Sequence, residues 1–222
     1  MSPSVSPVAS QILQALGALL LLTAFATIAS RHLSEYIRAF AAQSFFLALV
    51  AATVGYFVGS IDLFALALLT LLVKTGLITF ILSNVARRLK VQREVRPYLN
   101  LPASLLAGVL LTLLAFFASP AVVAPGTFLN EPPLAMSVAL VLIGLFIMST
   151  RRHALAQVVG LLTMENGLFS GAIAIAHGMP LIVELGILFD ILVAVLVMGL
   201  LVQLIQREFV SADTGELRRL KG

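Results

Sequence analysis

Seven apolar stretches, separated by short polar segments, make up most of this chain. They cover residues 12–29, 40–58, 63–82, 101–123, 134–149, 153–176 and 181–204. Each is close to the roughly 20 residues that an α-helix needs to cross the hydrocarbon of a bilayer. None has the alternating pattern of a membrane β-barrel strand, and only helices and closed barrels span lipid. The sequence therefore predicts an all-α, polytopic membrane helix bundle with seven transmembrane helices.

The composition agrees with a membrane protein and argues against several other classes. Hydrophobic residues make up 60% of the 222 residues and charged residues 11%, whereas a soluble domain carries about 25% charge. The net charge of +4 does not indicate a nucleic-acid partner, because the basic residues lie in short loops and in the tail. The chain has no cysteine and three histidines that form no cluster. We therefore expect no metal site and no cofactor in this chain.

The basic residues also predict the topology. Of the 14 lysines and arginines, all but Lys74 lie in the loops after the first, third and fifth stretches or in the tail. The alternate loops, 59–62, 118–133 and 177–180, contain neither residue type. Because cytoplasmic loops carry the excess of lysine and arginine, we expect the N-terminus outside and the C-terminus in the cytoplasm. We expect one transmembrane domain over 1–222, with four helices in 1–133, three in 134–206 and a cytoplasmic tail in 207–222.

Four ionisable side chains lie within sequence that is otherwise suited to hydrocarbon. Lys74, Glu165 and Asp190 are near the middles of the third, sixth and seventh stretches, about 15 Å from either surface. Glu184 is about one turn inside the outer end of its stretch, so it is either an outer-side relay or a solvated residue at the rim. His177 is either a residue at headgroup level or a further relay. Intramembrane charges of this kind mark ion pathways more often than not.

Two interpretations of these residues remain open. A buried pair between a lysine and an acid can simply neutralise charge and fix the register of two helices, often with little net stabilisation. Alternatively, desolvation raises the pKa of a buried carboxyl while a nearby cation lowers it, which brings such a group near neutrality and lets it load and release a proton. The second interpretation makes Glu165 and Asp190 proton-carrying sites, with Lys74 as their partner charge.

Three local features have simpler explanations. Gly160, Gly167, Gly171 and Gly178 share one stripe of the sixth helix, where small residues let another helix approach closely, and Glu165 lies on roughly the opposite side. The acid is therefore free to face another part of the bundle or a partner subunit. Asp62 is expected to be the N-cap of the third helix. The basic segment 87–96 fits a topological role, or binding to acidic lipid or to an acidic patch of a partner.

No nucleotide-binding fingerprint and no nucleophile constellation is present in the sequence, so chemistry by this chain alone is not expected. Without these motifs, three functions remain. The chain is a subunit of a larger membrane complex, an independent secondary ion transporter, or a purely structural membrane scaffold. The missing internal repeat and the missing broken helices count against the transporter.

Residues 151–171, RRHALAQVVGLLTMENGLFSG, and 178–199, GMPLIVELGILFDILVAVLVMG, resemble the membrane component E family of hydrogenase-4-type complexes. The last three helices, 134–206, are also similar to the small K subunit of respiratory complex I. There a paired arginine precedes a helix with a buried glutamate, and the next helix carries a second acid. The corresponding acids here, Glu165 and Asp190, are displaced by about one turn in the same direction.

The resemblance implies a non-catalytic, multi-pass subunit of the cytoplasmic membrane, with the metal centres in other chains. It also implies antiporter-like, proton-pumping subunits as neighbours. We therefore expect an accessory membrane subunit of an energy-converting redox complex. Its buried charges, Glu165, Asp190, Glu184 and Lys74, would contribute to the translocation of protons or other ions, with His177 as a further relay.

Overall fold

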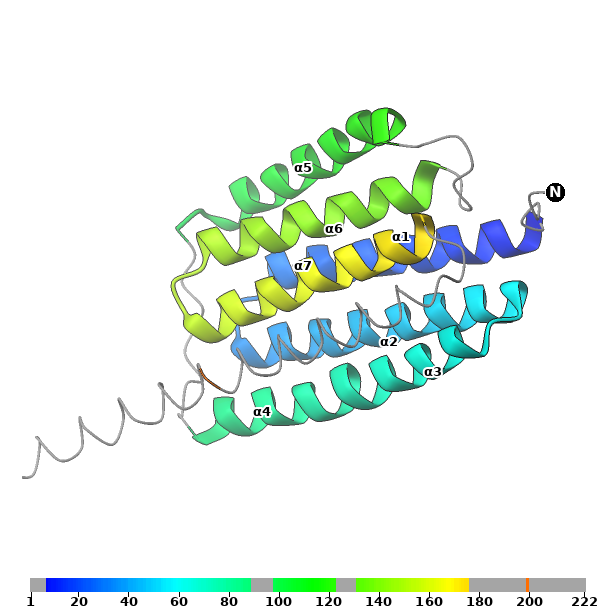
Figure 1. The fold of residues 1–222 in the computed structure, drawn as a ribbon. Helices are drawn as coiled ribbons and strands as arrows, with labels where there is room; N and C mark the ends of the chain where they lie inside the picture. The colour runs from blue at the N-terminus through cyan, green and yellow to red at the C-terminus, as the bar shows by residue number, and fades with distance from the viewer. Residues whose placement is uncertain (1–6, 89–97, 123–130, 176–198, 200–222) are drawn as a thin grey trace, which may run out of the picture. The chain divides into compact units, whose positions relative to one another are not determined.

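The computed structural model describes residues 7–88, 98–122, 131–175 and 199, and within these ranges it contains helices and no strand. Figure 1 shows the helices lying side by side along their lengths. In chain order they are α1 (Pro7–Ala29), α2 (Leu33–Val58), α3 (Ile61–Thr70), the π-helix η1 (Leu71–Ile78), α4 (Thr79–Arg88), α5 (Leu101–Val122), α6 (Glu131–Thr150) and α7 (Ala154–Ile175). The predicted all-α class is confirmed for this part of the chain.

The described residues hold 6 helical spans that are long and apolar enough to cross a membrane. One of them, Ile61–Arg87, consists of α3, η1 and α4 in continuous succession. These spans correspond to the first six predicted stretches. The seventh stretch, 181–204, lies outside the described residues apart from Gly199, so the count of seven stays a prediction.

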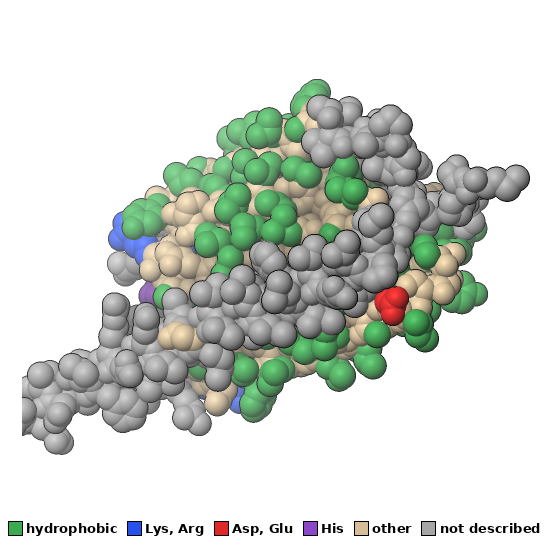
Figure 2. Space-filling model, viewed as in Figure 1, with side chains coloured by type: hydrophobic (Ala, Val, Ile, Leu, Met, Phe, Trp, Pro, Cys, Tyr) green, Lys and Arg blue, Asp and Glu red, His purple; other side chains and the backbone are tan. Residues whose placement is uncertain are grey.

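Helices α2 and α6 organise the bundle. α2 packs against α1, α7 and the whole α3–η1–α4 span, while α6 packs against α1, α5 and α7. The fully buried apolar side chains of these two helices include Leu47, Leu140 and Ile143. Figure 2 shows hydrophobic side chains over much of the outer flank. The exposed side chains of α5 include Phe117, which is 83% exposed. An apolar outer surface of this extent suits contact with lipid.

All of these helices belong to one compact unit, Met1–Ile187. A second unit, Leu188–Gly222, is described at Gly199 alone. The predicted single domain, with its parts 1–133, 134–206 and 207–222, stays a prediction.

α2 begins at Leu33 rather than at residue 40, where we expected it to start. Its first turns bury four side chains at helical spacing: Leu33, Tyr36, Ile37 and Phe40. Glu35 closes the start of the helix, since its Oε2 accepts hydrogen bonds from the backbone N–H groups of Arg31 (2.9 Å) and His32 (3.2 Å). As a result, Arg38 lies inside the helix and not in the loop before it.

The expected N-cap role of Asp62 is wrong. The N-cap of α3 is Ser60, and Asp62 lies within the first turn of the helix. A carboxylate in that turn still interacts favourably with the helix dipole, because the N–H groups there carry partial positive charge.

Arg151 connects the end of α6 to the rest of the bundle. Its side chain is 2% exposed, its Nη2 donates a 2.8 Å hydrogen bond to the carbonyl oxygen of Ile28, and its guanidinium lies 5.8 Å from the ring centroid of Tyr36. Burial lowers the pKa of Arg151, and the nearby Tyr36 opposes that shift. The guanidinium stays charged all the same, because its ordinary pKa is far above neutrality.

Candidate functional site

Lys74 lies in the π-helical segment of the third span. From Thr70 to Leu82 the buried residues of this span follow a spacing of four, at Thr70, Lys74, Ile78 and Leu82. In an α-helix four residues turn about 400°, so three such steps would rotate this line by about 120° around the axis. A π-helix has more residues in each turn, so four residues turn less than a full circle there, and the π-helical segment offsets the rotation of the α-helical parts. Thr79 stabilises the segment, since its hydroxyl donates a 3.0 Å hydrogen bond to the carbonyl oxygen of Lys74.

The side chain of Lys74 forms an ion pair with Glu165 of α7. The distance from Nζ to Oε1 is 2.8 Å, and the two side chains are 1% and 3% exposed. Both residues come from near the middles of their spans, Ile61–Arg87 and Ala154–Ile175. A pair this deeply buried is held by strong attraction but also carries a large desolvation cost. Replacing one partner by an apolar side chain would therefore be costly, whereas a glutamine at position 165 keeps an oxygen that can accept a hydrogen bond from Lys74.

Asn166 extends the ion pair into a network that spans four helices. Its Oδ1 accepts a 3.2 Å hydrogen bond from Lys74 Nζ. Its Nδ2 donates to Gln43 Oε1 at 3.1 Å and to Ser44 Oγ at 3.4 Å, both on α2. The Gln43 amide in turn donates to the carbonyl oxygen of Leu20 at 3.5 Å. Because all three side-chain partners of Asn166 are buried, the network is a polar region inside an apolar bundle.

An aromatic ring lies beside the cation. Lys74 Nζ is 5.3 Å from the ring centroid of Phe169, one turn along α7 from Glu165. The negative face of such a ring attracts a desolvated ammonium group. The cation thus has a carboxylate, an amide oxygen and an aromatic face around it, all supplied by α7.

Close packing of α6 on α7 sets the direction in which Glu165 points. A Cβ atom at Gly167 would lie 2.7 Å from the backbone nitrogen of Val141 and 2.9 Å from the carbonyl oxygen of Ser137. A Cβ at Gly160 would lie 2.8 Å from the backbone nitrogen of Met148. The predicted close approach at the glycine stripe is confirmed, and α6 is the helix that approaches. With that face occupied, the opposite face of α7 turns Glu165 toward η1 and α2.

The structure places two of the five predicted site residues, and it brings these two together. Glu184, Asp190 and His177 lie outside the described residues, so their roles stay predictions, as does the proton-carrying role of the pair. The open question of whether Glu165 faces the bundle or a partner has a geometric answer, since its oxygen contacts Lys74 of the same chain. In the described ranges, no group of three or more histidine, aspartate or glutamate side chains is placed to hold a metal ion.

Sequence reasoning missed Asn166, Gln43 and Ser44. Each is an uncharged polar residue inside an apolar run, where a single amide or hydroxyl changes the mean hydropathy very little. The available signals were the adjacency of Asn166 to Glu165 and the polar pair at 43–44 in an otherwise apolar helix. Both observations indicate a polar interior face, since buried amides in lipid need partners within the protein.

We expect Asn166→Leu to destabilise the purified chain. The change removes the acceptor of Lys74 and the donor to Gln43, and leaves buried polar groups without partners, at a cost of about 1–3 kcal/mol. The matched control is Asn84→Leu, because Asn84 is exposed on α4 and its change should alter stability by less than about 0.5 kcal/mol. Loss of helical circular dichroism during titration with SDS would measure both. Equal stability of the two variants would contradict the network.

Comparison with known proteins identifies relatives over nearly the whole chain. Hydrogenase-4 component E of Escherichia coli K12 is 31% identical over 215 residues, which cover 96% of this chain and 99% of that protein. Hydrogenase-4 component E of Shigella flexneri shows the same identity and coverage. The chain belongs to the hydrogenase-4 component E family. The resemblance of residues 151–199 to this family, expected from the sequence, is therefore confirmed.

This component E family protein also has a relative in Mycobacterium tuberculosis. The relative is the uncharacterized protein Rv0085, which is 37% identical over 194 residues, 86% of this chain and 87% of Rv0085. No protein-family model matches the chain. No solved structure matches it either. Family membership and the 6 apolar helical spans together make the chain a multi-pass membrane protein. Similarity to the K subunit of complex I stays a prediction.

Proposed function

We propose that this chain is a non-catalytic membrane subunit of a hydrogenase complex and supplies buried charges to its proton or ion pathway. The observation that carries the proposal is the Lys74–Glu165 pair, 2.8 Å long and buried near the middle of two membrane spans. Family membership supports the hydrogenase context. Catalytic metal centres belong, in this proposal, to other chains.

A buried ion pair can couple the movement of one charge to the movement of another. A proton that arrives at Glu165 neutralises the carboxylate and so removes its negative charge from beside Lys74. At low dielectric the cation then acts more strongly on other charges several ångströms away. In this proposal it favours release of a proton from a second acid of the pathway, a role that we assign to Asp190. Glu184 and His177 then connect Asp190 to the outer surface.

The chain crosses the cytoplasmic membrane seven times in this proposal, with its N-terminus outside. The distribution of charge supports that orientation. Figure 2 shows lysine and arginine side chains at the end of the bundle where α6 ends and α7 begins, and hydrophobic side chains over the flank. Arg31, Arg87 and Arg152 flank helix ends at that level. Such clustering is typical of the cytoplasmic side.

Antiporter-like membrane subunits are the proposed neighbours. Helix α5 offers a surface for such a contact, because few of its residues are buried within the described chain. Large exposed side chains on this helix include Leu106, Leu110, Leu113 and Phe117. Lipid accounts for the same surface, and co-purification of subunits with this chain from the membrane would show which of the two covers it.

Replacing the two deep acids tests the function. In complexes that contain Glu165→Gln or Asp190→Asn, we expect assembly and soluble redox activity to persist, while proton translocation falls by about tenfold or more, as for loss of a proton-transfer group. Proton uptake by proteoliposomes that contain the purified complex measures the effect. Normal translocation in both variants would favour the purely structural scaffold.

Reconstitution of this chain alone tests the stand-alone transporter. We expect no ion flux across proteoliposomes that contain only the purified chain, since the proposed pathway continues through partner subunits. Flux at the level of the assembled complex would contradict the subunit proposal.

A further inference from the structure

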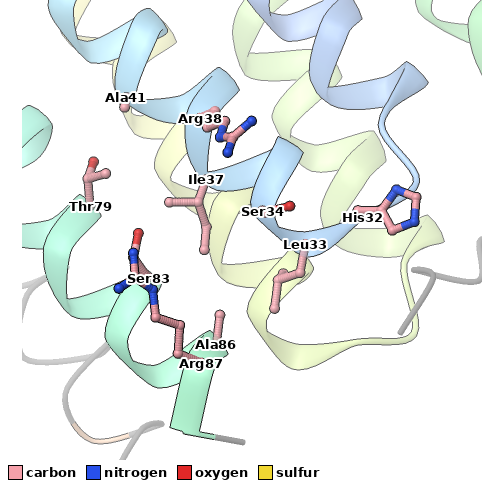
Figure 3. Close-up of a pocket in the computed structure, with 10 residues that line it drawn as sticks. All are labelled: His32, Leu33, Ser34, Ile37, Arg38, Ala41, Thr79, Ser83, Ala86 and Arg87. Atoms are coloured by element: carbon pink, nitrogen blue, oxygen red, sulfur yellow. The ribbon is translucent and has the colours of Figure 1, made fainter. Parts of the chain in front are cut away.

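A groove separates the first turns of α2 from α4. It has a volume of about 920 Å³, within the roughly 300–1,000 Å³ of most small-ligand sites. Figure 3 shows Ala41 and Thr79 at one end of this groove and Ala86 and Arg87 at the other. The described residues that line it are His32, Leu33, Ser34, Ile37, Arg38, Ala41, Thr79, Ser83, Ala86 and Arg87.

The charge of the groove is positive. Arg38 and Arg87 line it from its two walls, and both side chains are exposed. Among the described residues that line it, none is an aspartate or glutamate. The nearest acid along α2, Glu35, is engaged with the backbone N–H groups of Arg31 and His32. Two guanidinium groups in such a groove form a site for an anion, and phosphate oxygens match the fork of an arginine.

The floor of the groove is apolar, and its walls carry hydroxyl groups. Leu33 and Ile37 are 2% and 4% exposed beneath it. Ser34 and Ser83 add hydroxyl groups that can donate to an anion. From Arg87 to Thr79 the groove extends eight residues along the helix, about 12 Å. It therefore runs from the charged end of the bundle into the apolar part of a membrane span.

We propose that this groove binds the headgroup of an anionic phospholipid. Arg38 and Arg87 contact the phosphate, Ser34 and Ser83 hydrogen-bond to it, and the start of an acyl chain lies over Leu33 and Ile37. A small free anion would use the charged end and leave the apolar part empty. A phospholipid matches both parts, and basic pockets between membrane helices are known to hold such headgroups.

Native mass spectrometry of the full-length chain tests the site with phosphatidylglycerol and phosphatidylcholine of identical acyl chains. We expect the wild-type chain to retain phosphatidylglycerol about tenfold more than phosphatidylcholine, given two nearby arginines. The variant Arg38→Gln/Arg87→Gln should lose this preference. The control Arg31→Gln/Arg152→Gln removes the same charge near the same end but outside the groove, and should keep it.

A second variant tests the site without changing charge. Ala86→Phe fills the groove and should lower retention of phosphatidylglycerol several-fold. This variant tests whether the lipid binds in the groove even if the double arginine variant does not fold. Excess inorganic phosphate should leave the lipid bound. The proposal is overturned if phosphate displaces the lipid, if the control pair loses the preference equally, or if the assembled complex releases the lipid in favour of a partner's acidic segment.

Discussion

Lys74→Met should both destabilise this chain and stop proton translocation by the complex that contains it. The change leaves Glu165 buried with its cation removed, and breaking one side of a buried ion pair costs about 3–5 kcal/mol. SDS titration followed by circular dichroism would measure the loss of stability in the purified chain. Proton uptake by proteoliposomes that contain the complex would measure the loss of translocation.

The double variant Lys74→Met/Glu165→Met separates the two interpretations of the pair. Replacing both partners by apolar side chains of similar size is often neutral or stabilising, so stability should return to near that of the wild type. Translocation should stay lost, because the proton-carrying group is gone. A double variant that is stable and translocates protons normally would show that the pair has only a structural role. A single Lys74→Met variant as stable as the wild type would contradict the energetic coupling itself.

Gly167→Leu should give a large loss of stability. Even a single Cβ atom at this position would lie 2.7 Å from the backbone nitrogen of Val141. The backbone of α6 cannot move aside as a flexible side chain can. Helices α6 and α7 must then separate, and overpacking in a core costs about 1–3 kcal/mol or more for each misplaced group. We expect a marked fall in membrane expression and in resistance to SDS.

The matched control for this change is Gly76→Ala in η1. A Cβ at Gly76 would have its nearest neighbour, the carbonyl oxygen of Leu71, at 3.8 Å, an ordinary contact. Alanine should therefore be tolerated, with a gain of up to about 1 kcal/mol from helix propensity. Gly167→Ala adds a smaller side chain at the same position and should lose less stability than Gly167→Leu. If Gly167→Leu were as stable as the wild type, the α6–α7 contact could not be as close as described.

Much of the architecture follows from the sequence, because a bilayer allows few solutions. Apolar runs of about 20 residues fix the spans, and several helix ends fall within a residue or so of the expected limits. The stripe of Gly160, Gly167 and Gly171 predicted a close helix contact on one face of α7, and the helical period of 3.6 placed Glu165 on the other. The start of α2 was missed because its buried first turns also hold charged residues.

Contacts between distant helices did not follow from the sequence. Lys74 and Asn166 are 92 positions apart, and the third span is apolar all round, so its pattern does not indicate which face turns inward. The π-helical segment was also not predicted. The spacing of Thr70, Lys74 and Ile78 does not predict it, because positions four apart also share a face of an α-helix.

The proposed proton-carrying role of Glu165 is tested most directly by the reaction-induced infrared difference spectrum of the assembled complex during turnover with hydrogen. It detects carboxyl groups that gain or lose a proton. We predict a carboxyl band that is present with wild-type chain and absent with Glu165→Gln, in complexes that oxidise hydrogen at the same rate. A spectrum identical in the two complexes would contradict the account, because Glu165 would then keep one protonation state throughout turnover.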